Sequence, residues 1–261
     1  MTEKMPVLFV GHGNPMNAIE ENDFSKAWIE AGKELPQPRA IICVSAHWIT
    51  RGTMVTAMDK PRMIYDMYGF PPELYEVRYD APGSPDLAEQ VRRIIKTTEV
   101  KDDFEWGLDH GTWSVLNRMF PKANIPVIQM SLDATIRAEK HYEVAAQLKE
   151  LREEGVLIIG SGNIVHNLRL SMERLRTGDT RPYDWAVEFD AWAKEKIAGR
   201  DFQTLVTYEK AGEAGKLSVP TTDHYIPMLY SLGLAGEKEE IQQVYEEVAL
   251  GGISMRTFQV G

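Results

Sequence analysis

At 261 residues, with 43% hydrophobic and 26% charged side chains, the chain is long enough for one large core, and we expect a single domain over residues 1–261. Its 29 basic and 39 acidic residues give a net charge of −10, which repels nucleic acids and anionic membranes, so we expect neither as a partner. Cys43 is the single cysteine, and the sequence has no signal-like segment and no apolar run of about 18 residues, which together predict a cytoplasmic protein.

The first predicted element is a short buried strand in the apolar run from Pro6 to Val10. His12 follows it directly, between Gly11 and Gly13. In open α/β sheets, ligands bind outside the carboxyl ends of the strands, so His12 is the first candidate for a functional side chain. Helical spacing of apolar residues then predicts a helix over residues 23–33.

A second buried strand is predicted over residues 40–48, and we expect it to end at His47. A short strand over residues 54–58 comes next. Residues 61–85 are rich in proline, glycine and aromatic side chains, which predicts an ordered loop packed on the body of the protein. Its part from Tyr65 to Tyr79 can cover a site or serve as a structural cover.

Three further histidines lie at the ends of predicted elements. His110 comes just before a helix, His166 follows a buried strand and a glycine-rich turn, and Pro227 places His224 at the amino end of another helix. The remaining predicted elements are a helix capped by Ser84 over 85–96, a strand over 126–132, helices over 137–151 and 184–197, and a last strand over 252–260.

Alternating strands and helices predict an α/β domain with a central, mainly parallel (mixed) sheet flanked by helices. Five of the six histidines lie at strand ends or helix starts, whereas His141 lies in a charged helix and is expected to be exposed. Each of the five taken alone can be an ordinary hydrogen-bonded histidine. Their recurrence favours one pocket at the carboxyl edge of the strands, and imidazole nitrogens suit zinc or iron. Asp109 and Asp223 each precede a histidine and are candidates to orient an imidazole.

Two common signatures are missing. Gly160-Ser-Gly162 lacks the glycine spacing of a nucleophile elbow, and we interpret it as a tight turn. The glycine pairs at 11–13 and 160–162 lack the third glycine of a dinucleotide-binding fingerprint, and the sequence has no phosphate-binding loop.

Seven motifs together resemble the class III extradiol ring-cleavage dioxygenases, and within them the 4,5-DOPA extradiol dioxygenase branch. The resemblance spans nearly the whole chain. The motifs are Gly11-His-Gly-Asn-Pro15, Ser45-Ala-His-Trp48, Tyr68-Gly-Phe-Pro71, Ala81-Pro-Gly83, Asp109-His-Gly-Thr-Trp113, Gly160-Ser-Gly-Asn-Ile-Val-His-Asn167 and Asp223-His-Tyr225.

The resemblance implies a non-haem metal held by His12, His47 and His224, with Fe(II) for activity and Zn(II) also accommodated. It implies that His166 moves protons on the bound catechol, and that it closes on the metal as a fourth ligand when substrate is absent. It implies that His110 lies near substrate and dioxygen. The protocatechuate 4,5-dioxygenases have a glutamate as third ligand, so His224 is a departure. The segment Asn167-Leu-Arg-Leu-Ser171 also departs from the proline-containing segment of the plant pigment enzymes.

The expected reaction is Fe(II)-dependent cleavage of a catechol, DOPA-like or related, by O₂ to a muconate semialdehyde. Tyr68, Phe70 and Trp48 are the candidate substrate-binding aromatics, with packing in the core as the alternative for Trp48. A zinc hydrolase using the same histidines and a non-catalytic metal-binding protein are the competing hypotheses. The sequence is compatible with a monomer and with a homo-oligomer.

Overall fold

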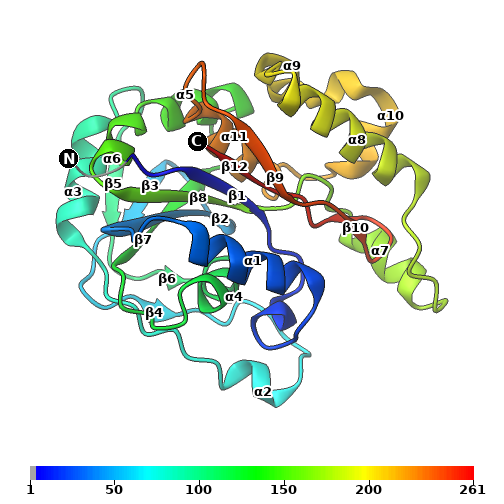
Figure 1. Cartoon of the computed structure of the whole chain (residues 1–261), viewed down its shortest axis with the longest axis horizontal. Helices are drawn as coiled ribbons and strands as arrows, with labels where there is room; N and C mark the ends of the chain where they lie inside the picture. Colours follow the sequence, from blue (N-terminus) through cyan, green and yellow to red (C-terminus); the bar gives the residue numbers. More distant parts are fainter. Residues whose placement is uncertain (1–3) are drawn as a thin grey trace.

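The computed structural model describes residues 4–261 and contains a central eight-stranded sheet (Figure 1). Its strands are β1 (Val7–Gly11), β2 (Ala40–Thr50), β3 (Thr53–Thr56), β5 (Val100–Asp103), β7 (Val127–Asp133), β8 (Val156–Gly162), β9 (Ile241–Tyr245) and β12 (Thr257–Val260). They are ordered β5-β3-β7-β2-β8-β1-β12-β9. Two small sheets pair β4 (Arg62–Met63) with β6 (Gly107–Leu108) and β10 (Val248–Ala249) with β11 (Ile253–Ser254).

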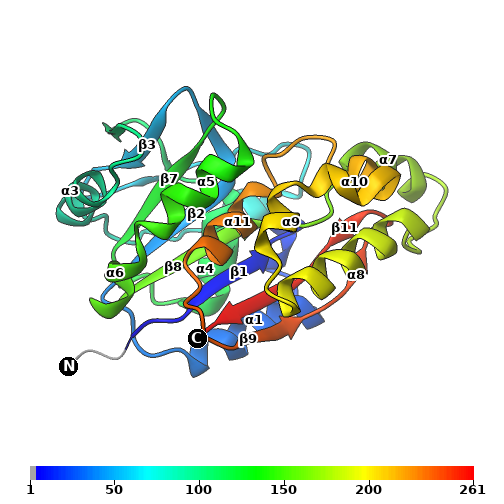
Figure 2. The same cartoon turned by 90° about the horizontal axis from the view of Figure 1, so that it is seen from above.

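Helices connect most of these strands. The longer ones are α1 (Asp23–Glu34), α3 (Pro85–Ile94), α4 (His110–Met119), α5 (Ala138–Ala146), α7 (Leu168–Leu175), α8 (Asp184–Ala198) and α11 (Ile226–Gly233). The shorter ones are η1 (Pro15–Ala18), α2 (Pro72–Tyr75), α6 (Lys149–Glu153), α9 (Phe202–Val206), η2 (Tyr208–Ala211) and α10 (Gly212–Ser218). Figure 2 shows α3 and the group formed by α8, α9 and α10 at opposite ends of the molecule. No helix within residues 4–261 has the length and apolarity needed to cross a bilayer.

The four central strands β7, β2, β8 and β1 run parallel to one another, whereas β12 at one side runs antiparallel to both of its neighbours, β1 and β9. Successive side chains of a strand point to opposite faces, so β1 contributes to two cores. Val7 and Phe9 pack in the core that includes residues of α5 and α11, and Leu8 and Val10 pack in the core that includes residues of α1 and α4. The predicted α/β class with a mainly parallel, mixed sheet is therefore confirmed.

Several predicted boundaries agree with the structure. Asn22 and Ser25 form a capping box at the start of α1, and the Ser84 side chain accepts a hydrogen bond from the Leu87 amide at the start of α3. Other boundaries were wrong. The helix predicted over 137–151 is divided into α5 and α6, and the last strand is divided into β11 and β12. Strand β2 does not end at His47 but continues to Thr50, and its register with β7 shifts between Val44 and Ile49.

The expectation that His141 is exposed was also wrong, because its side chain is completely buried. Its Nε2 lies 3.2 Å from the Asp133 carbonyl oxygen and its Nδ1 lies 3.2 Å from the Tyr230 hydroxyl. A carbonyl only accepts, so Nε2 carries the proton and Nδ1 accepts from Tyr230. The charged residues around His141 in the sequence gave no sign of these two partners. Burial lowers the pKa of His141 to about 4.

Candidate metal centre

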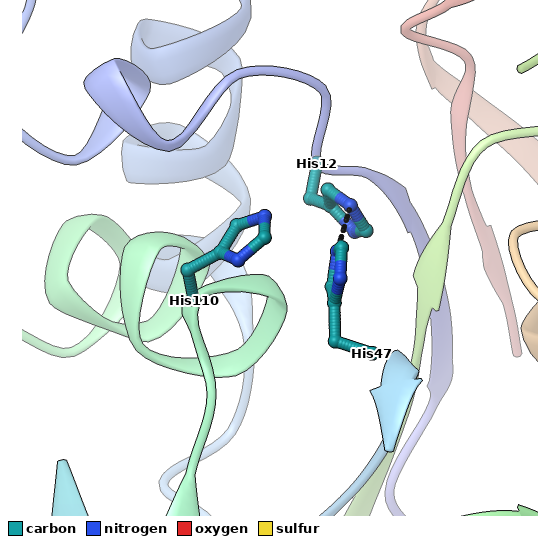
Figure 3. A group of neighbouring side chains, drawn as sticks. All are labelled: His12, His47 and His110. Carbon is teal, nitrogen blue, oxygen red and sulfur yellow. Dashed lines mark hydrogen bonds between the residues drawn. The ribbon is translucent and has the colours of Figure 1, made fainter. Parts of the chain in front are cut away.

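Five imidazoles from distant parts of the chain gather beyond the carboxyl ends of the central strands. Ring centroids are 5.0 Å apart for His12 and His47, 3.8 Å for His47 and His110, and 5.3 Å for His12 and His224. The ring of His166 stacks on that of His224 with centroids 3.5 Å apart. Figure 3 shows how His12, His47 and His110 converge from β1, β2 and α4. The structure thus brings together all five histidines that the sequence singled out.

Local sequence explains how two of these imidazoles reach the centre. His47 lies where the register between β2 and β7 shifts, and such an irregularity redirects side chains next to functional sites. His224 approaches the end of β8 because Gly162 has no side chain. A Cβ atom there would lie 2.2 Å from the His224 carbonyl oxygen. Gly160-Ser-Gly162 was therefore misread as a tight turn, since it lies within β8 and allows the chain before α11 to approach closely.

The closest approach within the centre joins His12 and His47, whose Nε2 atoms are 3.1 Å apart (Figure 3). Two nitrogens at this separation can both bind one ion at the usual length of about 2.0–2.1 Å. The ligand atoms of His12, His47 and His110 all lie within 4.8 Å of one another. In this group of three histidines His110 stands in the place that the family resemblance implies for His224.

The hydrogen bonds of Ser161 determine which nitrogen of His12 is protonated. The Ser161 hydroxyl donates its single proton to the Gly111 carbonyl oxygen and lies 2.9 Å from His12 Nδ1. It can only accept from that nitrogen, so His12 carries its proton on Nδ1. The Nε2 lone pair therefore points toward His47. Ser161 was not identified from the sequence, where it looked like part of a turn.

Carboxylates lie against Nδ1 of three further imidazoles, those of His47, His110 and His224, as Ser161 does for His12. Asp66 accepts bonds from the backbone amide and Nδ1 of His110, both at 2.9 Å, and its Oδ2 lies 3.4 Å from His47 Nδ1. Asp223 lies 2.5 Å from His224 Nδ1. Burial alone would raise the pKa values of both carboxyls, but the bonds from His110 and His224 hold them below their ordinary values. His12, His47, His110 and His224 thus each have Nδ1 against an acceptor, which leaves Nε2 as the nitrogen that can bind a metal.

Of the two predicted orienting carboxylates, Asp223 contacts an imidazole as expected, whereas Asp109 does not play that role. The Asp109 side chain accepts from Ser45, Gln129 and the Thr112 amide, and so it starts α4. Burial raises its pKa. Asp66 was missed because it lies 44 residues from His110 along the chain, in a loop that carried no charge pattern.

With its proton on Nδ1, toward Asp66, His47 turns its Nε2 lone pair toward that of His12 across 3.1 Å, which is unfavourable without a cation between them. The neutral tautomer of His47 with its proton on Nε2 would instead turn an Nδ1 lone pair toward the Asp66 carboxylate, and burial with the neighbouring imidazoles lowers the pKa values of both rings well below the ordinary value, which disfavours the imidazolium form. A metal cation satisfies both lone pairs, and neutral imidazole is the form that binds metals. The residues present therefore fit a metal ion.

The three candidate substrate-binding aromatics lie in different surroundings. Trp48 is buried and stacks on Trp106, with the ring planes 2° apart. Phe70 is partly buried against the core, whereas Tyr68 is 91% exposed. The loop that carries the last two is held by the Tyr65 hydroxyl, which donates to the Val77 carbonyl oxygen at 2.6 Å.

Comparisons with known proteins agree with this centre. Residues 5–257 match the family model described as the catalytic LigB subunit of aromatic ring-opening dioxygenase. The chain is 44% identical to the 4,5-DOPA dioxygenase extradiol of Escherichia coli K12, over 99% of this chain and 95% of that protein. It is 35% identical to the protein of the same name from Beta vulgaris, over 91% of this chain and 90% of that protein. A crystal structure of an uncharacterized protein from Escherichia coli K12 superposes with a TM-score of 0.86 and 42% identity, covering 98% of this chain and 100% of that chain.

Proposed function

Since this chain belongs to the LigB family of extradiol aromatic ring-opening dioxygenases, we propose that it cleaves a catechol with O₂, using Fe(II), to give a muconate semialdehyde. The observation that carries this proposal is the pair of Nε2 atoms on His12 and His47 that face each other 3.1 Å apart in a cluster of five imidazoles. Histidines on one side of an ion leave positions open on the other, as in non-haem iron oxygenases. Bound Fe(II) would bring catechol and O₂ together and pass electron density between them.

We infer that His12, His47 and His224 hold the ion. Asp223 keeps the proton of His224 on Nδ1 and so leaves Nε2 for the metal. The ring of His224 lies 5.3 Å from that of His12 and 5.0 Å from that of His47. His110, whose donor atom lies within 4.8 Å of those of His12 and His47, is assigned to the substrate and dioxygen side. His224→Ala should then abolish metal binding, whereas His110→Ala should keep one ion per chain and lose activity. The reverse pattern would make His110 the third ligand.

His166 is the proposed proton carrier. It lies against His224, and burial followed by the effect of His224 lowers its pKa to about 2, so the ring is neutral and has a lone pair to offer. The negative charge of a bound catecholate would raise this pKa, and the ring could then accept the second phenolic proton of the catechol and return it later in the reaction. His166→Ala should abolish ring opening and leave most of the iron bound. Loss of the metal from a folded His166→Ala protein would instead identify His166 as a ligand.

The test of the reaction itself is a small panel of catechols with anaerobically Fe(II)-loaded protein, followed at the yellow absorbance of the semialdehyde after O₂ is admitted. We expect absorbance to grow only with O₂ present. Turnover under strict anaerobiosis would indicate a zinc hydrolase instead. The absence of turnover with every catechol, at full iron loading, would indicate a metal-binding protein without this activity.

A further inference from the structure

We propose that the cavity beside His166 binds an anionic substituent of the catechol, a carboxylate on its side chain, through Lys216 and Arg169. The inference rests on the proposed function, because it names the class of catechol that the site takes. It assigns to two surface cations the role of selecting substrate.

The cavity has a volume of about 450 Å³, which is in the range of small-molecule sites. One part of its wall is formed by His166 and Asp223, the partner of His224, so the cavity adjoins the metal centre. Another part is formed by Leu168 and Leu217, with Arg169 and Lys216 beside them. A catechol ring at the metal centre can therefore extend its side chain past His166 into a space that has apolar walls and two cations.

Hydrogen bonds fix the two cation-bearing segments to each other and to His166. The His166 amide donates to the Ser218 carbonyl oxygen at 2.9 Å. The Asn167 side chain donates to the Leu217 carbonyl oxygen at 2.7 Å and accepts from the Leu170 amide at the start of α7. Arg169 lies two residues after Asn167, and Lys216 lies one residue before Leu217. The spacing between the proton carrier and the two cations is thus built into the backbone.

The charges of the lining favour an anion. Arg169 donates through Nη1 to Glu173 at 2.8 Å, and a guanidinium has five donors, so it keeps further donors for a ligand. Lys216 is exposed and adds a second full positive charge. Asp223, the acidic residue of the lining, is already engaged by His224 and by the Thr221 side chain. In a chain with a net charge of −10, Lys216, together with the guanidinium donors that Arg169 keeps beside its ion pair with Glu173, acts as a local attraction for a carboxylate.

The test compares two catechols of similar size, 3-(3,4-dihydroxyphenyl)propionate and the uncharged 4-ethylcatechol. Lys216→Gln and Arg169→Gln are made singly and together in the Fe(II)-loaded protein. Lys210→Gln and Arg176→Gln are matched controls, since they are neighbouring exposed cations outside the lining. Losing both charges should lower kcat/KM for the propionate at least about tenfold, as expected for charged hydrogen bonds, and change that for 4-ethylcatechol less than about twofold.

An anaerobic equilibrium titration of the same proteins with both catechols separates binding from turnover. The dissociation constant for the propionate should rise about tenfold in the double variant and stay unchanged in the controls. Equal effects on the two catechols, or none on either, would overturn the cavity assignment while leaving ring cleavage intact. If the wild-type protein binds both catechols equally and opens neither ring, both the cavity assignment and the proposed function fail. Selective binding without ring opening would refute the proposed function alone.

Discussion

Two buried polar regions of this molecule differ in how completely their groups are paired. Around Arg256, the guanidinium donates to both Asp190 carboxylate oxygens and to Gln243, and Ser254 donates to Asp190 as well. In the histidine cluster, Nδ1 of His12, His110 and His224 is paired in the same way, but the Nε2 atoms of His12 and His47 lie 3.1 Å apart and face each other. The first region is complete without a ligand, whereas the Nε2 pair of the second fits a cation. That difference distinguishes a structural network from a binding site.

Arg152 and His141 are two further buried polar side chains whose groups are paired. The Arg152 side chain donates to both carboxylate oxygens of Glu239 and to the carbonyl oxygens of Met5, Leu234 and Val260. Burial alone would raise the pKa of Glu239, but Arg152 holds it at about 2. His141 has a partner on each ring nitrogen. It therefore serves as an internal control for the cluster, being a buried imidazole with no lone pair left for a metal.

The largest effect is expected from removing one of the two facing imidazoles. His47→Ala should reduce ring opening by at least about 10³-fold, or roughly 4 kcal/mol, because the ion loses a ligand and its chemistry with it. Metal content per chain, measured by elemental analysis, should fall well below one. His141→Gln is the matched control and should keep both the metal and the activity. Full metal content in His47→Ala would show that His47 is not a ligand and that it does not differ from His141 in this respect.

In the Arg256 region the expected effect is on stability. Arg256→Met leaves the buried Asp190 carboxylate without its cation and with only the hydrogen bond from Ser254, so the free energy of unfolding should fall by about 3–5 kcal/mol. Urea titration measures the change. The double variant Arg256→Met, Asp190→Leu should recover most of the loss, because the unpaired charge is gone. If the single variant Arg256→Met is as stable as the wild type, Arg256 does not offset the burial of the Asp190 charge.

The paired histidine predicts a pH dependence. The pKa of His141 is lowered to about 4, while that of an unfolded histidine is about 6.5, so between these values the unfolded chain binds more protons. The contribution of neutral His141 to the free energy of unfolding is fully present above pH 6.5. It falls by about 3 kcal/mol in total as the pH drops toward 4. His141→Gln should remove this part of the slope in unfolding measurements from pH 7 to 4.5. An unchanged slope would show that His141 does not titrate in this way.

The smallest effect is expected at a carboxylate that orients the imidazoles. Asp66→Asn should weaken metal binding about 10–100-fold, since such partners set the tautomer and orientation of ligating histidines. Competition with a chelator measures the affinity. Asp80→Asn is the control, because that carboxylate is exposed in the same loop. Equal affinities in the two variants would mean that Asp66 only anchors the loop.

The sequence predicted the fold class and the gathering of five histidines, because buried strands and the residues at their ends have strong local patterns. It did not predict what depends on contacts between distant segments. Asp66 and Ser161 orient imidazoles far away along the chain, and nothing near them in the sequence indicated it. His141 was misjudged for the same reason, since its partner Tyr230 belongs to another helix. The shift of register around His47 also arises from pairing with β7 rather than from β2 itself.

The most direct test is an anomalous-diffraction measurement on crystals of the metal-loaded protein, collected on both sides of the absorption edge of the ion. We expect one peak per chain, within bonding distance of Nε2 of both His12 and His47, with their Nδ1 atoms still against Ser161 and Asp66. A peak bonded to an Nδ1 atom, or a fully loaded crystal with its ion outside this cluster, would contradict the account.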